Sequence, residues 1–308
     1  MSDIFYIDRL TGRKEKEKVY KAGAVQLFYG NNPLNKSLRY TLLPLVARLP
    51  IFSALYGHFQ KRSGTVKKIA PFIKNFDVDA SEFKKSVTEF RSFNDFFIRE
   101  LKKEARPIAP GNDLAVIPAD GRYYFYQDIA KCDGFIVKGQ KFDPVELLGD
   151  STLAQEYAEG AMVMARLCPS DYHRFHFPCR CVPEKAQLIN GSLYSVNPLA
   201  VKQNIKIYSQ NKRKLTKLTA TPFGTILYLE IGATNVGSIQ ETYTLGKTYQ
   251  KGDEKGYFEF GGSALILLFR KGIIQFDVDL LAATQKGLEM RCLLGQSMGN
   301  CTGVGSNH

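Results

Sequence analysis

The chain has 308 residues, of which 42 are Lys or Arg and 30 are Asp or Glu, so its formal net charge is +12. With 44% hydrophobic residues, 23% charged residues, 26 Gly and 13 Pro, the composition excludes disordered, fibrous and wholly membrane-embedded proteins. Six Cys are too few for a disulfide scaffold, so we expect reduced thiols. These counts indicate a globular protein whose excess of positive charge calls for an anionic partner.

The positive charge is concentrated in the first third of the chain. Residues 1–110 hold 21 basic and 11 acidic residues, a net of +10, whereas residues 111–308 hold 21 and 19, a net of +2. Nucleic acid, an anionic membrane surface and an anionic substrate are the partners that such a region attracts. We find no Cys/His finger, helix-turn-helix or aromatic-studded sheet motif, so no nucleic-acid partner is expected.

The first 20 residues contain no targeting pattern. They lack an apolar core and include the acidic residues Asp3, Asp8, Glu15 and Glu17. Secretory signals need an apolar segment, and transit peptides are poor in acidic residues. We therefore expect neither kind of signal.

The most apolar stretch of the basic region covers residues 38–56. Arg39 and Arg48 lie inside it, and Pro44 and Pro50 interrupt it, so it falls short of the roughly 20 apolar residues of a bilayer crossing. It predicts two short helical pieces with one apolar side and basic neighbours. This pattern is typical of helices in a membrane interface. It is equally typical of a helical subdomain that packs on the rest of the protein.

Residues 81–101 predict a helix, because large apolar side chains recur there at three- and four-residue steps. Ser92 or Asn94 would cap a shorter final helix. Residues 106–111, which include two Pro and a Gly, then end the helical pattern. We place a domain boundary here, between a helical, basic region, 1–108, and a β-rich domain, 109–308.

Short β-type runs separated by Gly-containing turns fill the second region. They are residues 115–117, 123–126, 134–137, 161–167, 225–231 and 264–269. The expected fold class is therefore α+β, with a helical N-terminal arm packed on a β-rich catalytic domain.

Two of the four His, His173 and His176, lie three residues apart near Cys168, Cys179 and Cys181. Such a cluster raises the alternative of a zinc-dependent hydrolase. However, Cys-x-Cys is not the usual zinc spacing and no second ligand pair follows, so we expect no metal. In an extended segment, residues three apart point to opposite faces, so the two His would have different roles. Two hydrogen-bonded core histidines are the plainer interpretation.

Gly261, Gly262 and Ser263 interrupt a strand pattern directly before the apolar run 264–269. One interpretation is a tight turn or bulge between strands. Another follows from the conformational freedom of glycine, which would let a strained backbone expose the Gly262 carbonyl to the Ser263 hydroxyl. That arrangement is what an N→O acyl shift and self-cleavage require.

Taken together, these residues resemble the phosphatidylserine decarboxylases, pyruvoyl-dependent enzymes of phospholipid synthesis. The resemblance covers about residues 90–269. The segments that carry it, in family order, are SFNDFFIR at 92–99 with RPI at 106–108, PADG at 118–121, DYHRFHFP at 171–178, YSVNP at 194–198, GATNVGSI at 232–239 and FGGS at 260–263.

The resemblance implies a proenzyme that cuts itself at the Gly262–Ser263 bond into a β chain, 1–262, and an α chain, 263–308. It matches the base of the family to His176 and the orienting carboxylate to Asp120, which completes an Asp–His–Ser triad. Elimination from the resulting ester and loss of ammonia would convert Ser263 into a covalent pyruvoyl group.

The same resemblance implies the reaction. The pyruvoyl group would form a Schiff base with phosphatidylserine, release CO₂ and give phosphatidylethanolamine. His173 matches the His that takes part in decarboxylation and protonation, for which an imidazole is suited. Asn197 is a candidate for substrate contact.

Three features depart from the family pattern. The cleavage motif reads Gly-Gly-Ser-Ala rather than Leu-Gly-Ser-Thr, and Lys212 stands where the family often has Glu. Cys168, Cys179 and Cys181 are not part of the pattern, so we interpret them as small buried residues or free thiols.

The charge distribution and the resemblance together predict the partners. The basic N-terminal region would hold the enzyme on an anionic membrane surface, peripherally, at the cytoplasmic side of a bacterial cell membrane. The α and β chains would stay associated, and a homodimer of these pairs is expected. The remaining alternative is a non-catalytic lipid-binding protein on the same scaffold.

Overall fold

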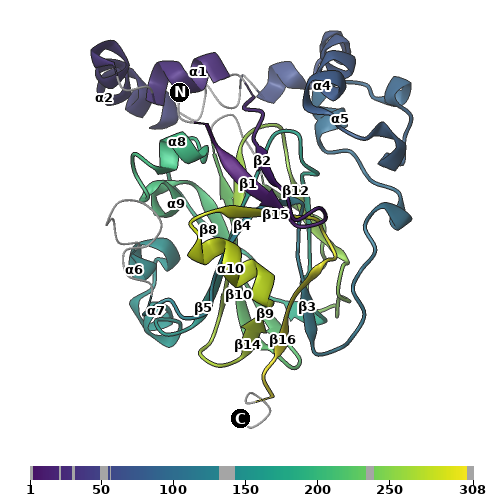
Figure 1. Cartoon of the computed structure of the whole chain (residues 1–308), viewed down its shortest axis with the longest axis vertical. Coiled ribbons are helices and arrows are strands. Elements are labelled where there is room, and N and C mark those ends of the chain that lie inside the picture. Colours follow the sequence, from purple (N-terminus) through teal and green to yellow (C-terminus); the bar gives the residue numbers. More distant parts are fainter. Residues whose placement is uncertain are drawn as a thin grey trace.

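The computed structural model describes residues 3–20, 22–29, 32–48, 55, 57–131, 143–233 and 239–303. A large central sheet lies below a row of N-terminal helices, and further short helices flank its sides (Figure 1). The mixture of helices with several sheets confirms the α+β class.

The central sheet has ten strands in the order β2-β1-β15-β4-β5-β13-β10-β9-β7, with β8 also paired to β9. Its strands are β1 Phe5–Asp8, β2 Lys14–Lys16, β4 Gly121–Tyr126, β5 Ala161–Leu167, β7 Cys181–Pro183, β8 Gln187–Ile189, β9 Arg213–Ala220, β10 Gly224–Gly232, β13 Ser263–Phe269 and β15 Glu289–Cys292. Among the described strand pairs of this sheet, β1 with β15 is the only parallel one.

Two three-stranded sheets complete the β structure, in the orders β11-β12-β6 and β14-β16-β3. Their strands are β3 Leu114–Val116, β6 Arg174–His176, β11 Ile239–Glu241, β12 Glu254–Phe258, β14 Ile274–Phe276 and β16 Ser297–Cys301. The first of them brings the His pair beside the chain that leads to Ser263, because β12 pairs with β6.

The helices are short, apart from α2. They are α1 Ala22–Tyr29, α2 Pro33–Arg48, α4 Ile69–Phe76, α5 Phe93–Phe97, α6 Pro144–Leu148, α7 Ser151–Glu156, α8 Pro198–Val201, α9 Ile207–Gln210 and α10 Val278–Gln285, with 3₁₀ turns η1 Ser63–Lys68, η2 Ala80–Glu82, η3 Val87–Glu89 and η4 Lys103–Ala105. None of the helices in the described part of the chain has the length and apolar character that a bilayer crossing requires.

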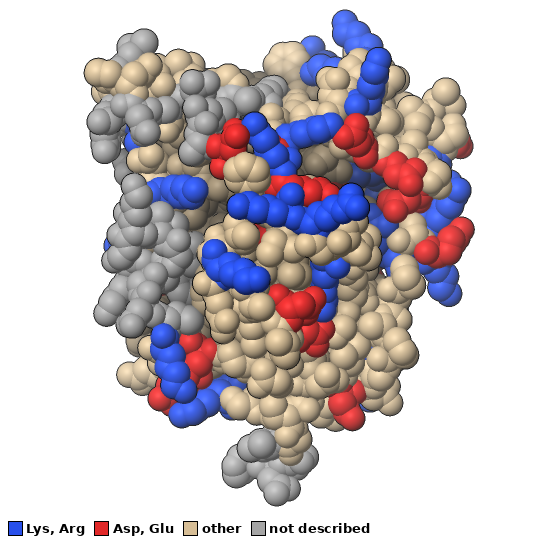
Figure 2. Space-filling model, in the orientation of Figure 1, with Lys and Arg blue, Asp and Glu red and all other residues tan. Residues whose placement is uncertain are grey.

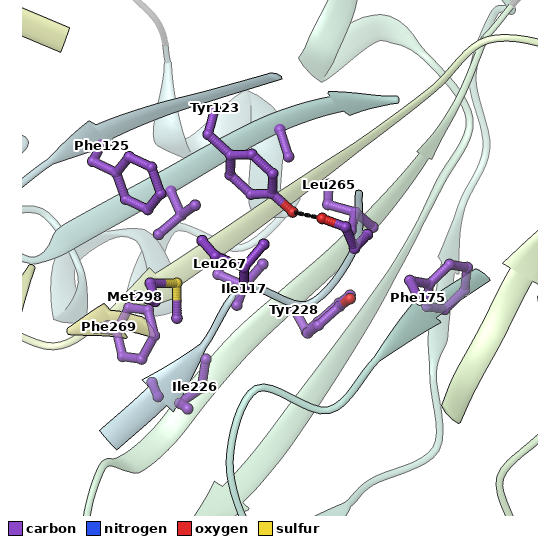
Figure 3. Packing of buried hydrophobic residues seen from close by; sticks show 14 of the residues in the cluster. Ile117, Tyr123, Phe125, Phe175, Ile226, Tyr228, Leu265, Leu267, Phe269 and Met298 are labelled. Carbon is purple, nitrogen blue, oxygen red and sulfur yellow. Dashed lines mark hydrogen bonds between the residues drawn. The ribbon is translucent and has the colours of Figure 1, made fainter. Parts of the chain in front are cut away.

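Strand β13 forms the middle of the hydrophobic core. Every residue of β13 is buried, and its side chains alternate between the two faces of the sheet. Leu265, Leu267 and Phe269 pack in the cluster that contains Tyr123 and Phe125 (Figure 3). The alternate residues enter a second cluster on the other face. A continuous apolar run is what a strand covered on both faces needs.

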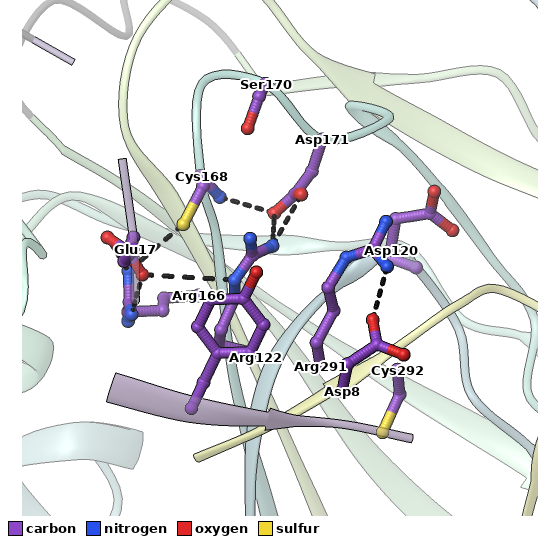
Figure 4. A network of polar contacts seen from close by, with 12 residues as sticks. Asp8, Glu17, Asp120, Arg122, Arg166, Cys168, Ser170, Asp171, Arg291 and Cys292 are labelled. Atoms are coloured by element: carbon purple, nitrogen blue, oxygen red, sulfur yellow. Dashed lines mark hydrogen bonds and ion pairs between the residues drawn. The ribbon is translucent and has the colours of Figure 1, made fainter. Parts of the chain in front are cut away.

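A buried polar network ties the N-terminal strands to the core (Figure 4). The guanidinium of Arg166 donates to both Glu17 and Glu289, and that of Arg122 donates to Asp171 at 2.6 Å. All five side chains are nearly inaccessible to solvent. The segment before α1 is therefore built into the β-rich body.

The structure differs from two sequence expectations. Residues 5–8 and 14–16 are strands of the central sheet, whereas we expected a helical region from residue 1 to 108. Residues 81–101 form η3 and α5 instead of one helix, because capping at Ser86 and Ser92 starts a new element each time.

The predicted β runs are confirmed within two residues at each end, except for 134–137, which lies outside the described residues. The first expected piece of the 38–56 segment falls within α2. Residues 49–54 and 56 of that segment also lie outside the described part.

Candidate active site

Ser263 is the first residue of β13 and lies at the centre of the large sheet. It pairs with Gly232 of β10 on one side and with Leu167 of β5 on the other. Its side chain is fully buried. The carbonyl of the preceding Gly262 accepts a hydrogen bond from the Ala233 amide at 3.1 Å. Backbone contacts therefore fix the Gly262–Ser263 bond, and the Ser263 hydroxyl is shielded from water.

The first residue of the Gly261-Gly262 pair has the unusual backbone conformation. Gly261 has φ +151°, in the region that favours glycine. A Cβ on Gly262 would lie 3.4 Å from that of Ala233 and 3.7 Å from a methyl of Val196. Gly261 thus supplies the turn into β13, and a side chain at position 262 would be in van der Waals contact with Ala233 and Val196.

His173 is the side chain that meets Ser263. Its Nδ1 lies 3.4 Å from Ser263 Oγ, and its Nε2 lies 3.0 Å from the Cys168 carbonyl oxygen. A carbonyl can only accept, so Nε2 carries the proton and Nδ1 is free to accept from the hydroxyl. Full burial lowers the pKa of His173 to about 3. The ring is therefore neutral and oriented as a hydrogen-bond acceptor toward Ser263.

His176 lies on β6, opposite Glu254 of β12. Its Nδ1 is 2.9 Å from the Gly252 carbonyl oxygen, and its buried Nε2 has no hydrogen-bond partner among the described residues. Burial also lowers the pKa of His176. This ring is thus held through one nitrogen, while the other is unengaged.

Asp120 is bound by other groups. Its Oδ2 accepts from Arg106 Nη2 at 2.7 Å, and its Oδ1 accepts from the Leu294 amide at 2.8 Å. Arg106 also reaches Glu82 at 2.8 Å. The structure therefore brings Ser263 to His173, whereas Asp120 and His176 each have different partners.

Comparison with known proteins shows the family of this chain. A family model described as phosphatidylserine decarboxylase matches residues 93–300. The chain belongs to the phosphatidylserine decarboxylase family. The resemblance inferred from the sequence is thus confirmed.

Curated relatives match almost the whole chain. A phosphatidylserine decarboxylase proenzyme of Chlamydia caviae is 51% identical over 97% of this chain and 98% of its own length. The Chlamydia felis protein of the same name is 50% identical over 98% and 100%. That of Chlamydia trachomatis serovar D is 40% identical over 96% and 97%. The similarity therefore includes the N-terminal region as well as the family's β-rich part.

The YSVNP motif of the family borders the scissile bond. Val196 lies close to Gly262, and Asn197 caps α8 by accepting from the Leu199 amide at 3.0 Å. Asn211, which our sequence analysis missed, donates to the carbonyls of Tyr194 and Gly232 at 2.8 and 2.9 Å. Asn211 thereby joins this motif to the strand beside Ser263. Its place next to Lys212 was the only sequence signal.

The three cysteines near the His pair are buried free thiols. Cys168 Sγ accepts from Arg166 at 3.1 Å, and burial raises the pKa values of Cys168 and Cys179. Within the described residues, no three His, Cys, Asp or Glu side chains meet in a way that could hold a metal ion.

Proposed function

We propose that this chain is a proenzyme that cleaves itself between Gly262 and Ser263 and then decarboxylates phosphatidylserine to phosphatidylethanolamine. The observation that carries this proposal is the buried hydroxyl of Ser263, directly beside both the Gly262 carbonyl and the neutral ring of His173. Membership of the phosphatidylserine decarboxylase family supplies the reaction and the substrate class.

The self-cleavage step needs only groups of this chain. Ser263 Oγ attacks the Gly262 carbonyl carbon and gives its proton to an imidazole. The peptide C–N bond then breaks, the nitrogen takes a proton, and Gly262 is left as an ester on Oγ. The hydrogen bond from the Ala233 amide to the Gly262 oxygen is placed to stabilise the negative charge that develops there.

Conversion of the ester follows by elimination. Loss of the Ser263 Cα proton releases the Gly262 carboxylate, and water then displaces ammonia to leave a ketone. The site suits such a group, because the group derives from the buried Ser263 and lies beside His173. The pyruvoyl group supplies the electron sink for decarboxylation.

We propose the division of roles that the family resemblance implies. His176, oriented by Asp120, would take the Ser263 proton during cleavage, and His173 would move the proton at the reacting carbon. The position of His173 next to Ser263 supports its role. The free Nε2 supports that of His176, although Asp120 would first have to exchange Arg106 for the imidazole.

The geometry also offers His173 as the cleavage base. Single variants separate the two assignments. We expect His176→Ala to remain one uncut chain, and His173→Ala to be cut but to release no CO₂ from phosphatidylserine vesicles. An uncut His173→Ala together with a cut His176→Ala would transfer the base role to His173.

The whole function is tested by the decarboxylation assay. Wild-type protein should release CO₂ from phosphatidylserine vesicles, and Ser263→Ala should release none. Vesicle binding without CO₂ release by the wild type would instead indicate the non-catalytic lipid-binding protein.

We further propose that the helical region holds the enzyme on an anionic membrane surface, peripherally, at the cytoplasmic side. Leu27, Leu55 and Phe59 are 43%, 51% and 50% exposed there. Arg62 lies over the ring of Phe59, at 4.5 Å. Figure 2 shows Lys and Arg side chains at this end of the molecule, interspersed with fewer acidic ones. Apolar side chains beside basic ones suit an interface with anionic headgroups.

The helical region also reaches the site. Tyr29 of α1 and Leu43 of α2 are buried in the same cluster as Val196 and Ala233, which border Gly262. A lipid bound at these helices would therefore lie over the hydrophobic cluster that borders Gly262. After cleavage, β13 would remain paired with β5 and β10, which supports a lasting association of the α and β chains.

A further inference from the structure

The segment 92–99 is a family motif to which the mechanism above gives no role. Its only regular element is the five-residue α5, which begins after Ser92, whose hydroxyl accepts from the Asp95 amide at 3.1 Å. The side chains of α5 are largely buried, and they touch both halves of the candidate site.

One set of contacts reaches the chain just before the scissile bond. Asn94 Oδ1 accepts a hydrogen bond from the Phe260 amide at 2.9 Å. The Phe260 ring packs against those of Phe93 and Phe97, with centroids 5.2 and 4.8 Å apart. Because Phe260 is two residues before Gly262, these contacts fix the direction from which the carbonyl reaches Ser263.

A second set reaches the loop that carries His173. The ring of Phe97 stacks on that of His173, with centroids 3.8 Å apart and planes inclined by 23°. Arg99 Nη2 donates to the carbonyl oxygens of Ser170 and Asp171 at 3.1 and 3.0 Å. This loop thus rests on α5 through a ring and a guanidinium.

Two of the three guanidinium nitrogens of the buried Arg99 lack a hydrogen-bond partner among the described residues, which is unusual for a residue with a purely structural role. Arg99 is 4% exposed and lies over the rings of Phe83 and Phe96, and these two nitrogens are its Nε and Nη1. Burial lowers the pKa of Arg99 to about 10. A buried cation with unmet donors adds little stability compared with an apolar side chain of similar size. Its contacts with the His173 loop offer a better reason for its presence.

We propose that Asn94 and Arg99 are positioning residues, Asn94 for the scissile Gly262 carbonyl and Arg99 for the His173 loop. This inference rests on the proposed function, since both residues position groups of the same site. It separates two effects: Asn94 acts before cleavage only, whereas Arg99 also acts in the decarboxylation that follows.

The test measures two quantities in the full-length protein. The first is the rate at which the 1–308 chain is cut, followed by intact mass. The second is the CO₂ released from phosphatidylserine vesicles per blocked α chain. A merely structural residue changes the yield of folded protein but leaves both the cleavage rate of the folded chain and the turnover per α chain unaltered.

Asn94→Leu removes the acceptor, and Asn94→Asp keeps an oxygen in its place. We expect Asn94→Leu to slow cleavage about tenfold to a hundredfold, since small misplacements of reacting groups have effects of that size. Asn94→Asp should recover part of the rate. Molecules of either variant that are cut should turn over like the wild type.

Arg99→Met removes the donors without leaving a cavity, and Arg99→Lys keeps one donor group. We expect turnover per α chain to fall about tenfold or more in Arg99→Met with KM unchanged, and to recover in part in Arg99→Lys. The matched control is Asp150→Ala, which removes the cap of α7 far along the chain. It should lower the melting temperature but leave cleavage rate and turnover unchanged.

Normal turnover per α chain in Arg99→Met, or cleavage of Asn94→Leu at the wild-type rate, would overturn the assignment. A wild-type chain that is never cut would instead refute the proposed function, so the two failures are distinguishable.

Discussion

The chain before the scissile bond and the chain after it are held by different regions of the molecule. Ser263 belongs to β13, which is paired on both edges and covered on both faces by the large sheet's clusters. The chain before it, at Phe260, packs in a cluster of aromatic rings built from the helical region, including Phe72, Phe93 and Phe97. The helical region therefore takes part in forming the site as well as in carrying charge.

This comparison changes the meaning of the basic first third of the chain. We interpreted its net charge of +10 as a membrane-association region separate from the catalytic domain. In the structure, the same residues supply two strands of the central sheet and one side of the site. A truncation that removes the first 74 residues would thus disrupt the central sheet, so it cannot serve as a test of membrane binding alone.

The largest expected effect comes from truncating one buried side chain in the aromatic cluster and one in the core of the large sheet. Phe260→Ala should destabilise the protein by about 3–5 kcal/mol and Leu267→Ala by about 2–5 kcal/mol, because both side chains are buried. We expect the folded fraction of Phe260→Ala to be cut slowly and that of Leu267→Ala at the wild-type rate. Denaturant titration together with intact mass measures both quantities. Equal cleavage rates would mean that the aromatic cluster does not position the bond.

The next effect tests how firmly the N-terminal segment is joined to the sheet. Glu17→Gln removes a charge from the buried pair with Arg166 and should cost on the order of 3 kcal/mol at neutral pH. Burial opposes ionisation of Glu17, but the charge of Arg166 outweighs it and lowers the pKa of Glu17. Because the pKa of Glu17 is lower in the folded state, its ionised form stabilises the fold fully at pH values above the pKa of the unfolded chain. This stabilisation is lost as the pH falls through the pKa of the folded state.

The stability difference between wild type and Glu17→Gln should therefore be full at neutral pH and narrow below about pH 4, near the ordinary pKa of Glu. Urea titrations at several pH values check this. If the difference in the free energy of unfolding did not change with pH, the charge of Glu17 would not stabilise the contact between the N-terminal segment and the sheet.

The smallest effect concerns the membrane surface. Arg62→Gln with Lys67→Gln removes two exposed charges from the helical region and should weaken binding to anionic vesicles by about 1 kcal/mol per charge at low salt. Vesicle sedimentation over a salt series measures this. The matched control, Lys185→Gln with Lys247→Gln, removes two exposed charges from the β-rich body and should bind like the wild type. Equal losses in both pairs would indicate attraction by net charge alone.

The sequence predicted the parts of the fold whose cause is local. β5 and β13 are continuous apolar runs between turn signals, and their bounds were found within a residue. β1 and β2 have four and three residues, and they depend on pairing with each other and with the distant β15, which leaves no local pattern. The long helix expected at residues 81–101 does not form, because Ser86 and Ser92 cap the starts of two separate shorter elements.

The candidate site shows the same limit. The His pair and the Gly-Ser bond were found from their residue types and the family resemblance. That His173 and not His176 lies beside Ser263 depends on the pairing of β6 with β12 and on a loop held by Arg99, with 90 positions between the two side chains. The ion pair of Asp120 with Arg106 joins two predicted motifs, but nothing in the sequence shows that they meet.

The most direct test of the account is the intact mass of the purified wild-type protein under denaturing conditions. We predict two chains, one ending at Gly262 and one spanning residues 263–308. The second should be blocked at its N-terminus and lighter by one ammonia than the unmodified segment. A single intact chain of 308 residues, or a cut at any other bond, would contradict the central claim that Ser263 both cleaves the chain and becomes its reactive group.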